Sequence, residues 1–343
     1  MIAPAHARGR LAALGLLAQD YHRFPTSAAA AAGFKQWVHV AVIDPEIALV
    51  ANFSAIAAPG GTAHRLVALV HTGEVRGHAR RFAPEQCAMP VGRTALRFGH
   101  NELTVAGHHH ALSLDEPALG LRARLSLRAV ASPAVLYHLP LGAQRALHWA
   151  VVPRLTATGE IEYAGRRHAI RDAPAYRDRN WGSFRFGDMA WDWGYAAAPA
   201  GGPPCALAFA RLMDASRSRV IEQHLLVWWA GALLASFRDR EVAYALDGAY
   251  TGALPTLPAA LALCRPGHAT DVPEVVTVTA ASSRGRVALR FTRAATARVV
   301  VPNESRLGTT AIYESFGAIA ATGRVDGQDI ELTGRGLFEC VHG

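Results

Sequence analysis

The sequence predicts an all-β protein made of two antiparallel β-barrel or β-sandwich domains packed together. Three observations lead to this prediction: many short segments alternate apolar and polar residues, turn-forming pairs lie between them, and long amphipathic helices are few. The chain has 343 residues, which is long for one domain, so two barrel-like units are expected rather than one large sheet. Because 51% of the residues are hydrophobic and 18% are charged, the chain can bury a large core.

The predicted strands are segments in which apolar residues alternate with polar ones or form a continuous run. The clearest of them are residues 36–44, 64–71, 121–130, 275–281 and 286–293. Turns are predicted at Thr72-Gly73, Thr158-Gly159 and Asp326-Gly327. The last is the strongest of the three, because an Asp-Gly pair between alternating residues favours a tight hairpin turn.

Two segments are candidates for helices, residues 8–19 and residues 255–264. The proline-containing stretch 131–144 interrupts the strand pattern, so we expect a domain boundary there. The predicted domains are therefore residues 1–140 and residues 141–343.

The formal net charge of +8 comes almost entirely from arginine, since Lys35 is the only lysine. The arginines are spread along the chain and do not gather with stacking aromatics, so nucleic acid is not an expected partner. The apolar run near the N-terminus is short for a signal peptide, and no run reaches the roughly 18 residues of a membrane span. At most, peripheral contact with a membrane is expected.

The four cysteines, Cys87, Cys205, Cys264 and Cys340, lie far apart and form no CxxC pair. Scattered cysteines in a chain of this size are typical of reduced core residues, which favours a cytoplasmic protein.

Several enzyme classes lack their linear motif in this chain: there is no GxSxG, no P-loop, no GxGxxG and no HExxH. In the run His108-His109-His110, only His108 and His110 could share one face of a strand, and no nearby carboxylate or cysteine completes a metal site. We therefore expect neither a metal nor an organic cofactor.

The stretch "YRDRNWGSFRFGDMAWDWGYA", residues 176–196, combines charged and aromatic residues. Read as a strand, its first part places Tyr176, Asp178 and Asn180 on one face and Arg177 and Arg179 on the other. Burying guanidinium groups costs more than burying the first row, so we expect the arginines to face outward.

An inward Asp178 among tryptophans would have a raised pKa, because burial disfavours the ionised form. It could then exist as a neutral acid and donate a proton, with Tyr176 and Asn180 orienting it through hydrogen bonds. A structural role for Asp178, in which it binds backbone amides at a strand end, remains open.

Three tryptophans belong to the same stretch. Trp191 and Trp193 share one face of the following strand and are candidates for the wall of a substrate cavity, although a role in the core is as well supported. Trp181 is a candidate substrate contact or an outward packing residue.

At these residues the sequence resembles a known family. "AYRDRNWG" followed by "WDWG" is similar to the motifs of the carotenoid 1,2-hydratase (hydroxyneurosporene synthase)-like family, whose wider lipocalin-like superfamily includes tocopherol cyclases and fungal intramolecular Diels–Alderases. The resemblance is specific over residues 147–196 and more diffuse elsewhere. It implies two lipocalin-like (calycin-like) barrels and a cavity for a long apolar molecule.

The resemblance also implies roles for individual residues. Asp178 matches the family's acid, which protonates an isolated C=C bond, and Tyr176 matches the tyrosine two residues before it. The family's His and Trp correspond to His148 and Trp149 in "LHW". The hydratases of the family separate that pair by one residue, whereas here the two are adjacent, so only one can face the cavity of a regular strand.

The resulting hypothesis is a hydratase or cyclase that acts on an olefinic bond of an apolar isoprenoid-like or polyketide-like molecule, with Asp178 as the proton donor. Two alternatives stay open: a non-catalytic carrier of a hydrophobic small molecule, and a pericyclase that acts mainly by shape. The substrate and the oligomeric state do not follow from the sequence.

Overall fold

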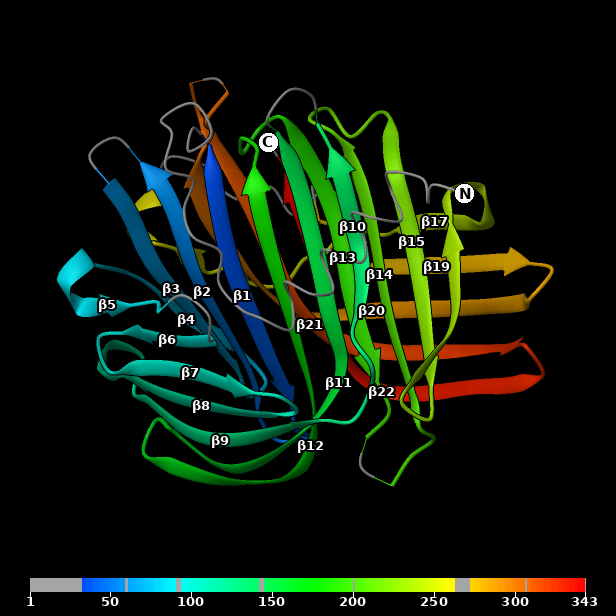
Figure 1. Ribbon diagram of the computed structural model, residues 1–343, viewed down its shortest axis with the longest axis horizontal. Coiled ribbons are helices and arrows are strands. Elements are labelled where there is room, and N and C mark those ends of the chain that lie inside the picture. Colours follow the sequence, from blue (N-terminus) through cyan, green and yellow to red (C-terminus); the bar gives the residue numbers. More distant parts are fainter. Residues whose placement is uncertain are drawn as a thin grey trace. The chain divides into compact units, whose positions relative to one another are not determined.

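The computed structural model describes residues 33–58, 61–90, 94–141, 145–199, 201–262, 272–305 and 307–342. The described residues form twenty-two β-strands joined by turns and four short 3-10 helices (Figure 1). The predicted all-β class is therefore confirmed. None of the described helices is long and apolar enough to cross a membrane.

The chain divides into two compact units. The first unit ends at Phe184 and the second begins at Arg185, except that the short segments Pro45–Ala48 and Leu69–Gly77 group with the second unit. This division differs from the predicted boundary near residue 140. The difference has a clear cause: the strand that follows residue 145 continues the sheet of the first unit and pairs there on both sides.

The sheet of the first unit has twelve strands in the order β4-β3-β2-β1-β12-β11-β9-β8-β7-β6-β5, with β10 paired to β11. Its strands are β1 (Phe34–Ile43), β2 (Ala48–Ala58), β3 (Gly61–His71), β4 (Val75–Phe82), β5 (Cys87–Ala88), β6 (Thr94–Phe98), β7 (Asn101–Ala106), β8 (His109–Glu116), β9 (Leu121–Ala129), β10 (Ala134–Pro140), β11 (Ala146–Tyr163) and β12 (Arg166–Ser183). In Figure 1, β6–β9 run across the direction of β1–β3.

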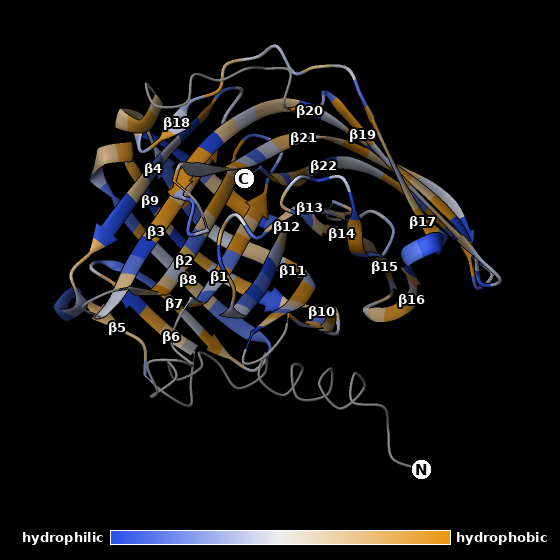
Figure 2. Ribbon diagram, turned by 90° about the horizontal axis from the view of Figure 1, so that it is seen from above, coloured by the Kyte–Doolittle hydropathy of each residue, from blue (hydrophilic) through white to orange (hydrophobic). Residues whose placement is uncertain are grey.

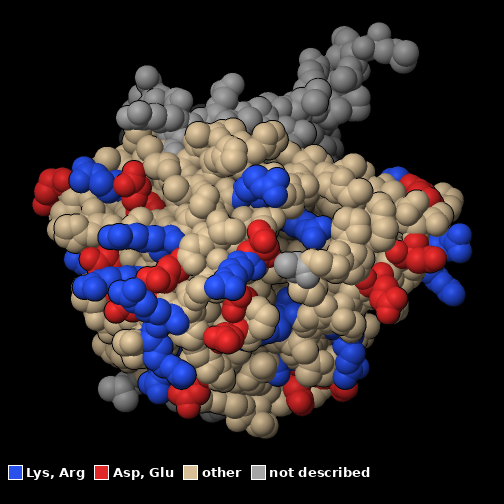
Figure 3. All heavy atoms as spheres, turned by 90° about the horizontal axis from the view of Figure 1, so that it is seen from below, with Lys and Arg blue, Asp and Glu red and all other residues tan. Residues whose placement is uncertain are grey.

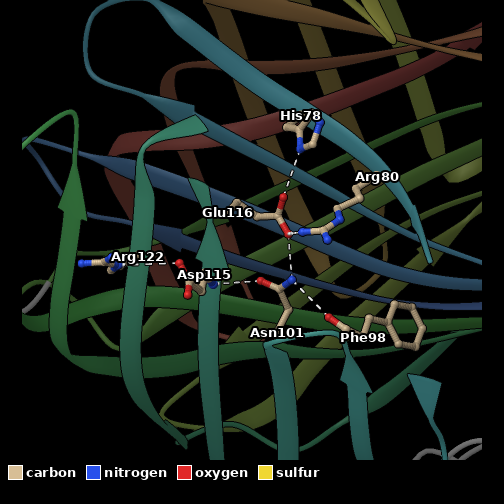
Figure 4. Close-up of polar contacts among 7 residues, drawn as sticks. All are labelled: His78, Arg80, Phe98, Asn101, Asp115, Glu116 and Arg122. Carbon is tan, nitrogen blue, oxygen red and sulfur yellow. Dashed lines mark hydrogen bonds and ion pairs between the residues drawn. The ribbon is translucent and has the colours of Figure 1, made fainter. Parts of the chain in front are cut away.

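A buried polar cluster shows how strongly this sheet curls (Figure 4). Glu116, near the end of β8, accepts a hydrogen bond from Asn101 of β7 at 2.7 Å. The same carboxylate reaches β4, where His78 lies at 3.0 Å and Arg80 at 3.8 Å. Strands β8 and β4 are seven positions apart in the sheet order. They can meet only across the interior of a sheet that is rolled toward a barrel.

The sheet of the second unit has ten strands in the order β16-β15-β14-β13-β22-β21-β20-β19-β17, with β18 paired to β20. Its strands are β13 (Met189–Ala197), β14 (Cys205–Asp214), β15 (Val220–Trp229), β16 (Ala232–Arg238), β17 (Val242–Asp247), β18 (Thr256–Leu257), β19 (Val275–Ser282), β20 (Gly285–Pro302), β21 (Thr309–Val325) and β22 (Gln328–His342). One face of this sheet carries a core of apolar side chains that includes Phe209, Phe291 and Phe338.

The alternation that predicts the strands also determines their buried faces. β9, for example, alternates buried and exposed residues along its length. Figure 2 shows the same alternation of hydrophobic and hydrophilic residues along many strands. On the face drawn in Figure 3, cationic and anionic side chains are interspersed and do not form a patch of one sign.

The hairpin predicted at Asp326-Gly327 is confirmed. Both residues have positive φ angles, 46° and 81°, and they connect β21 to β22. Two positive φ angles are the requirement of a type I′ turn.

The turn predicted at Thr158-Gly159 is wrong. β11 continues through this pair, and the register shifts beside Gly159, which forms a β-bulge. A Cβ atom at Gly159 would lie 2.1 Å from the carbonyl oxygen of Arg124. The glycine is therefore present because two backbones approach closely, and not because the chain reverses direction.

The two helix predictions have different outcomes. Residues 8–19 lie outside the described residues. In the stretch 255–264, for which a short helix is predicted, the described part contains the short strand β18 and one 3-10 turn, Ala259–Ala262. Cys205 and Cys340 are buried free thiols and Cys87 is a half-buried one, while Cys264 lies outside the described residues.

Candidate active site

The candidate site is built on β12, which lies between β1 and β11 in the sheet of the first unit. Its last residues, from Ala175 to Ser183, are all buried. The expectation that Arg177 and Arg179 face outward is wrong, because their exposures are only 2% and 1%. It assumed that one face of the strand meets water, but β12 is a central strand whose two faces are both covered.

The Asp178 carboxyl group binds three side chains. Oδ2 accepts hydrogen bonds from the indole Nε1–H of Trp149 at 2.9 Å and from the hydroxyl of Tyr176 at 3.0 Å. Oδ1 accepts a hydrogen bond from the amide Nδ2 of Asn180 at 3.0 Å. The structure thus brings together four of the residues singled out in the sequence.

The register of the strands explains this convergence. Trp149 on β11 lies directly opposite Asn180, so its side chain is on the face that carries Tyr176 and Asp178. Asp178 is 2% exposed, and the three residues that bind it are also buried. A carboxyl group held by three donors in a buried site has a fixed position and orientation, as a directed proton transfer requires.

The three donors differ in what they can do. The Trp149 indole can only donate, so it fixes Oδ2 as an acceptor. The Tyr176 hydroxyl and the Asn180 amide can each donate or accept, the amide after rotation by half a turn. The arrangement can therefore accommodate Asp178 as a carboxylate or, with Asn180 turned, as an acid protonated on Oδ1.

His39 of β1 is a site residue that the sequence analysis missed. It lies opposite Asp178 in the register of β1 and β12, and its ring centre is 6.3 Å from that of Tyr176. Burial lowers the pKa of His39 to about 3, so its imidazole is neutral near pH 7. The alternation of "WVHV" marked His39 as a strand residue, but only the pairing of β1 with β12 brings it beside the acid.

His148 and Trp181 lie on the opposite face of the sheet from Asp178. They are paired across β11 and β12, and their rings stack with centres 5.0 Å apart. His148 also forms a hydrogen bond with His138, between the two Nδ1 atoms at 2.7 Å. The structure therefore places His148 and Trp181 away from Asp178, and a catalytic role of His148 and a substrate contact of Trp181 stay predictions. Of the adjacent pair in "LHW", Trp149 is the residue that faces the acid.

Gly182 of the "RNWG" motif has a structural role. Its φ angle is +146°, and a Cβ atom there would lie 2.0 Å from the carbonyl oxygen of Ala146. Only glycine fits this position. It allows β11 to approach the end of β12, which keeps the register that sets Trp149 against Asp178.

Trp191 and Trp193 belong to the second unit, where both are buried on β13. The indole of Trp191 donates a hydrogen bond to Glu339 of β22. Burial raises the pKa of the Glu339 carboxyl group, although hydrogen bonds from Glu314 and Trp191 oppose that shift. A role of these tryptophans as the wall of a cavity around Asp178 stays a prediction.

Asp192, between these two tryptophans, points to the other face of β13 and is fully buried. It forms ion pairs with Arg211 at 2.5 Å and with Arg217 at 2.7 Å. Gly194 follows on the same strand, and a Cβ atom there would lie 2.1 Å from the ring of Phe209. The "WDWG" motif therefore contains a buried ion-pair centre and a position at which an aromatic ring packs on bare backbone.

Within the part of the chain that the structure describes, no three side chains of the His, Cys, Asp or Glu type come together as ligands for a metal ion. His110, from the histidine run, is buried on β8, while its neighbour His109 is exposed. Burial and the nearby Arg177 lower the pKa of His110 to about 3.

Comparisons with known proteins identify relatives in fold. No protein-family model matches the chain, and no curated protein matches it. Among solved structures, a protein from Nitrosomonas europaea named as an AttH candidate has a TM-score of 0.62 and 16% identity over 93% of this chain and 96% of that one. Kievitone hydratase from Nectria haematococca has a TM-score of 0.59 and 13% identity over 95% of each chain.

A third solved structure, CghA with Sch210972, has a TM-score of 0.59 and 15% identity over 94% of each chain. These similarities extend over nearly the whole of each protein. The chain therefore has the two-domain, all-β, lipocalin-like fold that these three proteins share.

Proposed function

We propose that the protein is an enzyme that adds water to, or cyclises, an olefinic bond of an apolar small molecule, with Asp178 as the acid. The observation that supports this most directly is the carboxyl group of Asp178, buried and held by Trp149, Tyr176 and Asn180. A positioned acid in a dry site is sufficient for the protonation of a C=C bond.

The proposed step begins with protonated Asp178. Its O–H proton moves to the less substituted carbon of the double bond, and the π electrons form the new C–H bond. The other carbon becomes a tertiary carbocation, and Asp178 becomes a carboxylate. The Trp149 and Tyr176 hydrogen bonds stabilise that carboxylate, while the aromatic faces of the site suit a cation that has no hydrogen-bonding group.

In hydration, a water oxygen attacks the carbocation and forms an oxonium ion, which loses one proton to give the alcohol. We assign the first acceptance of that proton to His39. Its imidazole is neutral because burial lowers its pKa to about 3. An oxonium ion is a far stronger acid than an imidazolium, so even this weak base can accept the proton. The proton then returns to Asp178, and the sum of the steps is the addition of one water molecule.

In cyclisation, a second double bond of the same molecule attacks the carbocation in place of water. Loss of a proton to the Asp178 carboxylate then restores the acid, and the product has the composition of the substrate. The same residues support both outcomes, and access of water to the cation decides between them.

The fold comparison is consistent with this proposal, because one of the proteins that share the fold is a hydratase. At 13% identity that similarity concerns the fold, and the proposal depends on the Asp178 geometry and on the motif in which it occurs.

The test is turnover of acyclic isoprenoid olefins in deuterated water by the purified full-length chain, followed by mass spectrometry. Hydration adds the mass of one water and leaves one deuterium on carbon, whereas cyclisation leaves the composition unchanged apart from exchanged deuterium. Asp178→Asn should lower turnover by about 10²–10⁴-fold, the usual contribution of a general acid. Asp172→Asn, an exposed position on the same strand, is the matched control and should keep full turnover.

Full turnover by folded Asp178→Asn would refute the role of the acid. A ligand that binds equally well to both proteins and is recovered unchanged would indicate a carrier. Partial loss in Asp178→Asn, combined with strong loss in Trp191→Ala and Trp193→Ala, would indicate a pericyclase.

A further inference from the structure

The interior face of β20 in the second unit carries two arginines. β20 pairs with β21 in regular register except for one extra residue between Arg293 and Ala295. This bulge changes the alternation, so that Arg293 lies on the same face as Thr296 and Arg298. Their partners across the pairing, on that same face, are Gly317, Ser315 and Tyr313. In a regular strand without the bulge, Arg293 and Arg298 would point to opposite faces, because their numbers differ by an odd count.

Arg298 is 2% exposed, and among the described residues its side chain has a hydroxyl partner and no carboxylate partner. Its Nε and Nη2 atoms both donate to the hydroxyl of Thr256, at 3.1 and 2.7 Å. Its Nη1 atom is buried and has no hydrogen-bond partner in the described part of the chain. A buried guanidinium group lowers the stability of the folded protein unless hydrogen-bond acceptors pair with all of its N–H groups.

Arg293 is in a similar position and is 5% exposed. Its Nε donates to the carbonyl oxygen of Pro273 at 2.7 Å, and its Nη1 donates to the hydroxyls of Thr296 and Ser315. Its Nη2 atom is buried, and among the described residues it has no hydrogen-bond partner. The guanidinium lies 5.3 Å from the ring centre of Phe338, on the apolar core.

Other groups on this face do not supply the missing negative charge. Asp192, which interacts with Arg293 electrostatically, is already bound by Arg211 and Arg217. Burial raises the pKa of the Cys340 thiol to about 12, so the thiol is neutral. Burial also raises the pKa of Tyr250. Arg298 therefore has a hydroxyl partner and no anion, and the carboxylate that interacts with Arg293, that of Asp192, is already paired with two other arginines.

We propose that Arg293 and Arg298 form a binding site for a carboxylate in the interior of the second unit. The planar N–H fork of arginine matches the two oxygens of a carboxylate, and the hydroxyls of Thr256, Thr296 and Ser315 can add hydrogen bonds. A phosphate dianion fits less well, because the cost of burying an ion among aromatic rings rises steeply with its charge. The carboxylate can be a small acid or the head group of a longer apolar acid.

Asp178 and its hydrogen-bond donors belong to the first unit, whereas these arginines belong to the second, and the two proposals depend on different residues. Binding of a carboxylate can therefore be tested without knowledge of the olefin substrate. The failure of one proposal leaves the other untouched.

The experiment is a titration of the full-length protein with acetate, with decanoate and with inorganic phosphate at constant ionic strength, followed by the melting temperature and by calorimetry. A ligand that binds only the folded state raises the melting temperature as its concentration exceeds Kd. We expect saturable binding of a carboxylate, and weakening of at least tenfold in Arg298→Met and Arg293→Met. Arg290→Met, an exposed position on the same strand, should bind as the wild type does.

Arg298→Lys provides a second test if the methionine variants fold poorly, since it keeps the charge and loses the planar fork. It should also bind at least tenfold more weakly. Saturation by acetate identifies the carboxylate group alone as sufficient, whereas saturation by decanoate only identifies a longer apolar acid. The proposal is overturned if no carboxylate binds the wild type, if phosphate alone binds, or if the arginine variants bind carboxylate as tightly as Arg290→Met.

Discussion

The hydrogen bond between Trp149 and Asp178 allows a quantitative prediction. Trp149→Phe keeps an aromatic ring and removes the indole N–H that lies 2.9 Å from the carboxylate oxygen. A hydrogen bond to the carboxylate form of Asp178, the form that the proposed protonation step produces, contributes about 1.5–3 kcal/mol. The smaller ring also leaves a cavity of roughly 40 Å³, which costs about 1 kcal/mol at about 24 cal/mol per Å³. The total expected loss in the free energy of unfolding is therefore about 2.5–4 kcal/mol.

A double-mutant cycle separates the two contributions. Trp149→Phe is measured alone and in the background of Asp178→Leu, which has a similar shape and cannot accept a hydrogen bond. The cavity contributes in both backgrounds and cancels, so the coupling free energy should be about 1.5–3 kcal/mol. The assay is urea unfolding at pH 7 followed by circular dichroism. A coupling free energy below about 0.5 kcal/mol, the usual error of additivity, would show that the bond does not hold Asp178 in solution.

Three other predictions concern the stability of the folded protein. Burial lowers the pKa of His110 to about 3 in the folded protein, whereas the unfolded chain has an ordinary histidine pKa. The contribution of His110 to the free energy of unfolding is therefore full above about pH 6.5 and falls by about 1.4 kcal/mol per pH unit as the pH drops toward 3. Urea unfolding at pH 6.5 and pH 5 should show a smaller loss of stability in His110→Gln than in the exposed control His109→Gln. Asp192→Asn should destabilise the protein by about 3–5 kcal/mol in the same assay, because it leaves two arginines without their buried carboxylate, whereas Asp329→Asn, in an exposed ion pair, should change stability little. Gly182→Ala should lower the melting temperature strongly or prevent folding, and a melting curve like that of the wild type would contradict the close approach of its backbone to β11.

The fold class follows from the sequence because the alternation of apolar and polar residues within each strand shows which of its faces is buried. The alternation of β9 and the Asp-Gly turn between β21 and β22 depend on residues that are neighbours in the chain. The same local reasoning places Tyr176, Asp178 and Asn180 on one face of a strand, as the structure has them. Local patterns fail where the conformation depends on the pairing of two strands. For this reason the sequence predicts a turn at Gly159, whereas the structure has a β-bulge there.

The sequence by itself determined that the chain is all-β and that Asp178 shares a strand face with Tyr176 and Asn180. Only the tertiary structure decided the rest of the site. The pairing of β12 with β11 selects Trp149 rather than His148 as the partner of the acid, and its pairing with β1 brings His39 beside it. The physical reason is that alternation along a strand assigns each side chain to one of two faces. Which residues of neighbouring strands lie side by side depends on the strand register, and whether a face is buried depends on what packs against it. Arg177 and Arg179 show this most clearly: their place on the strand was predictable, whereas their burial depends on a second covered face that no local pattern reveals.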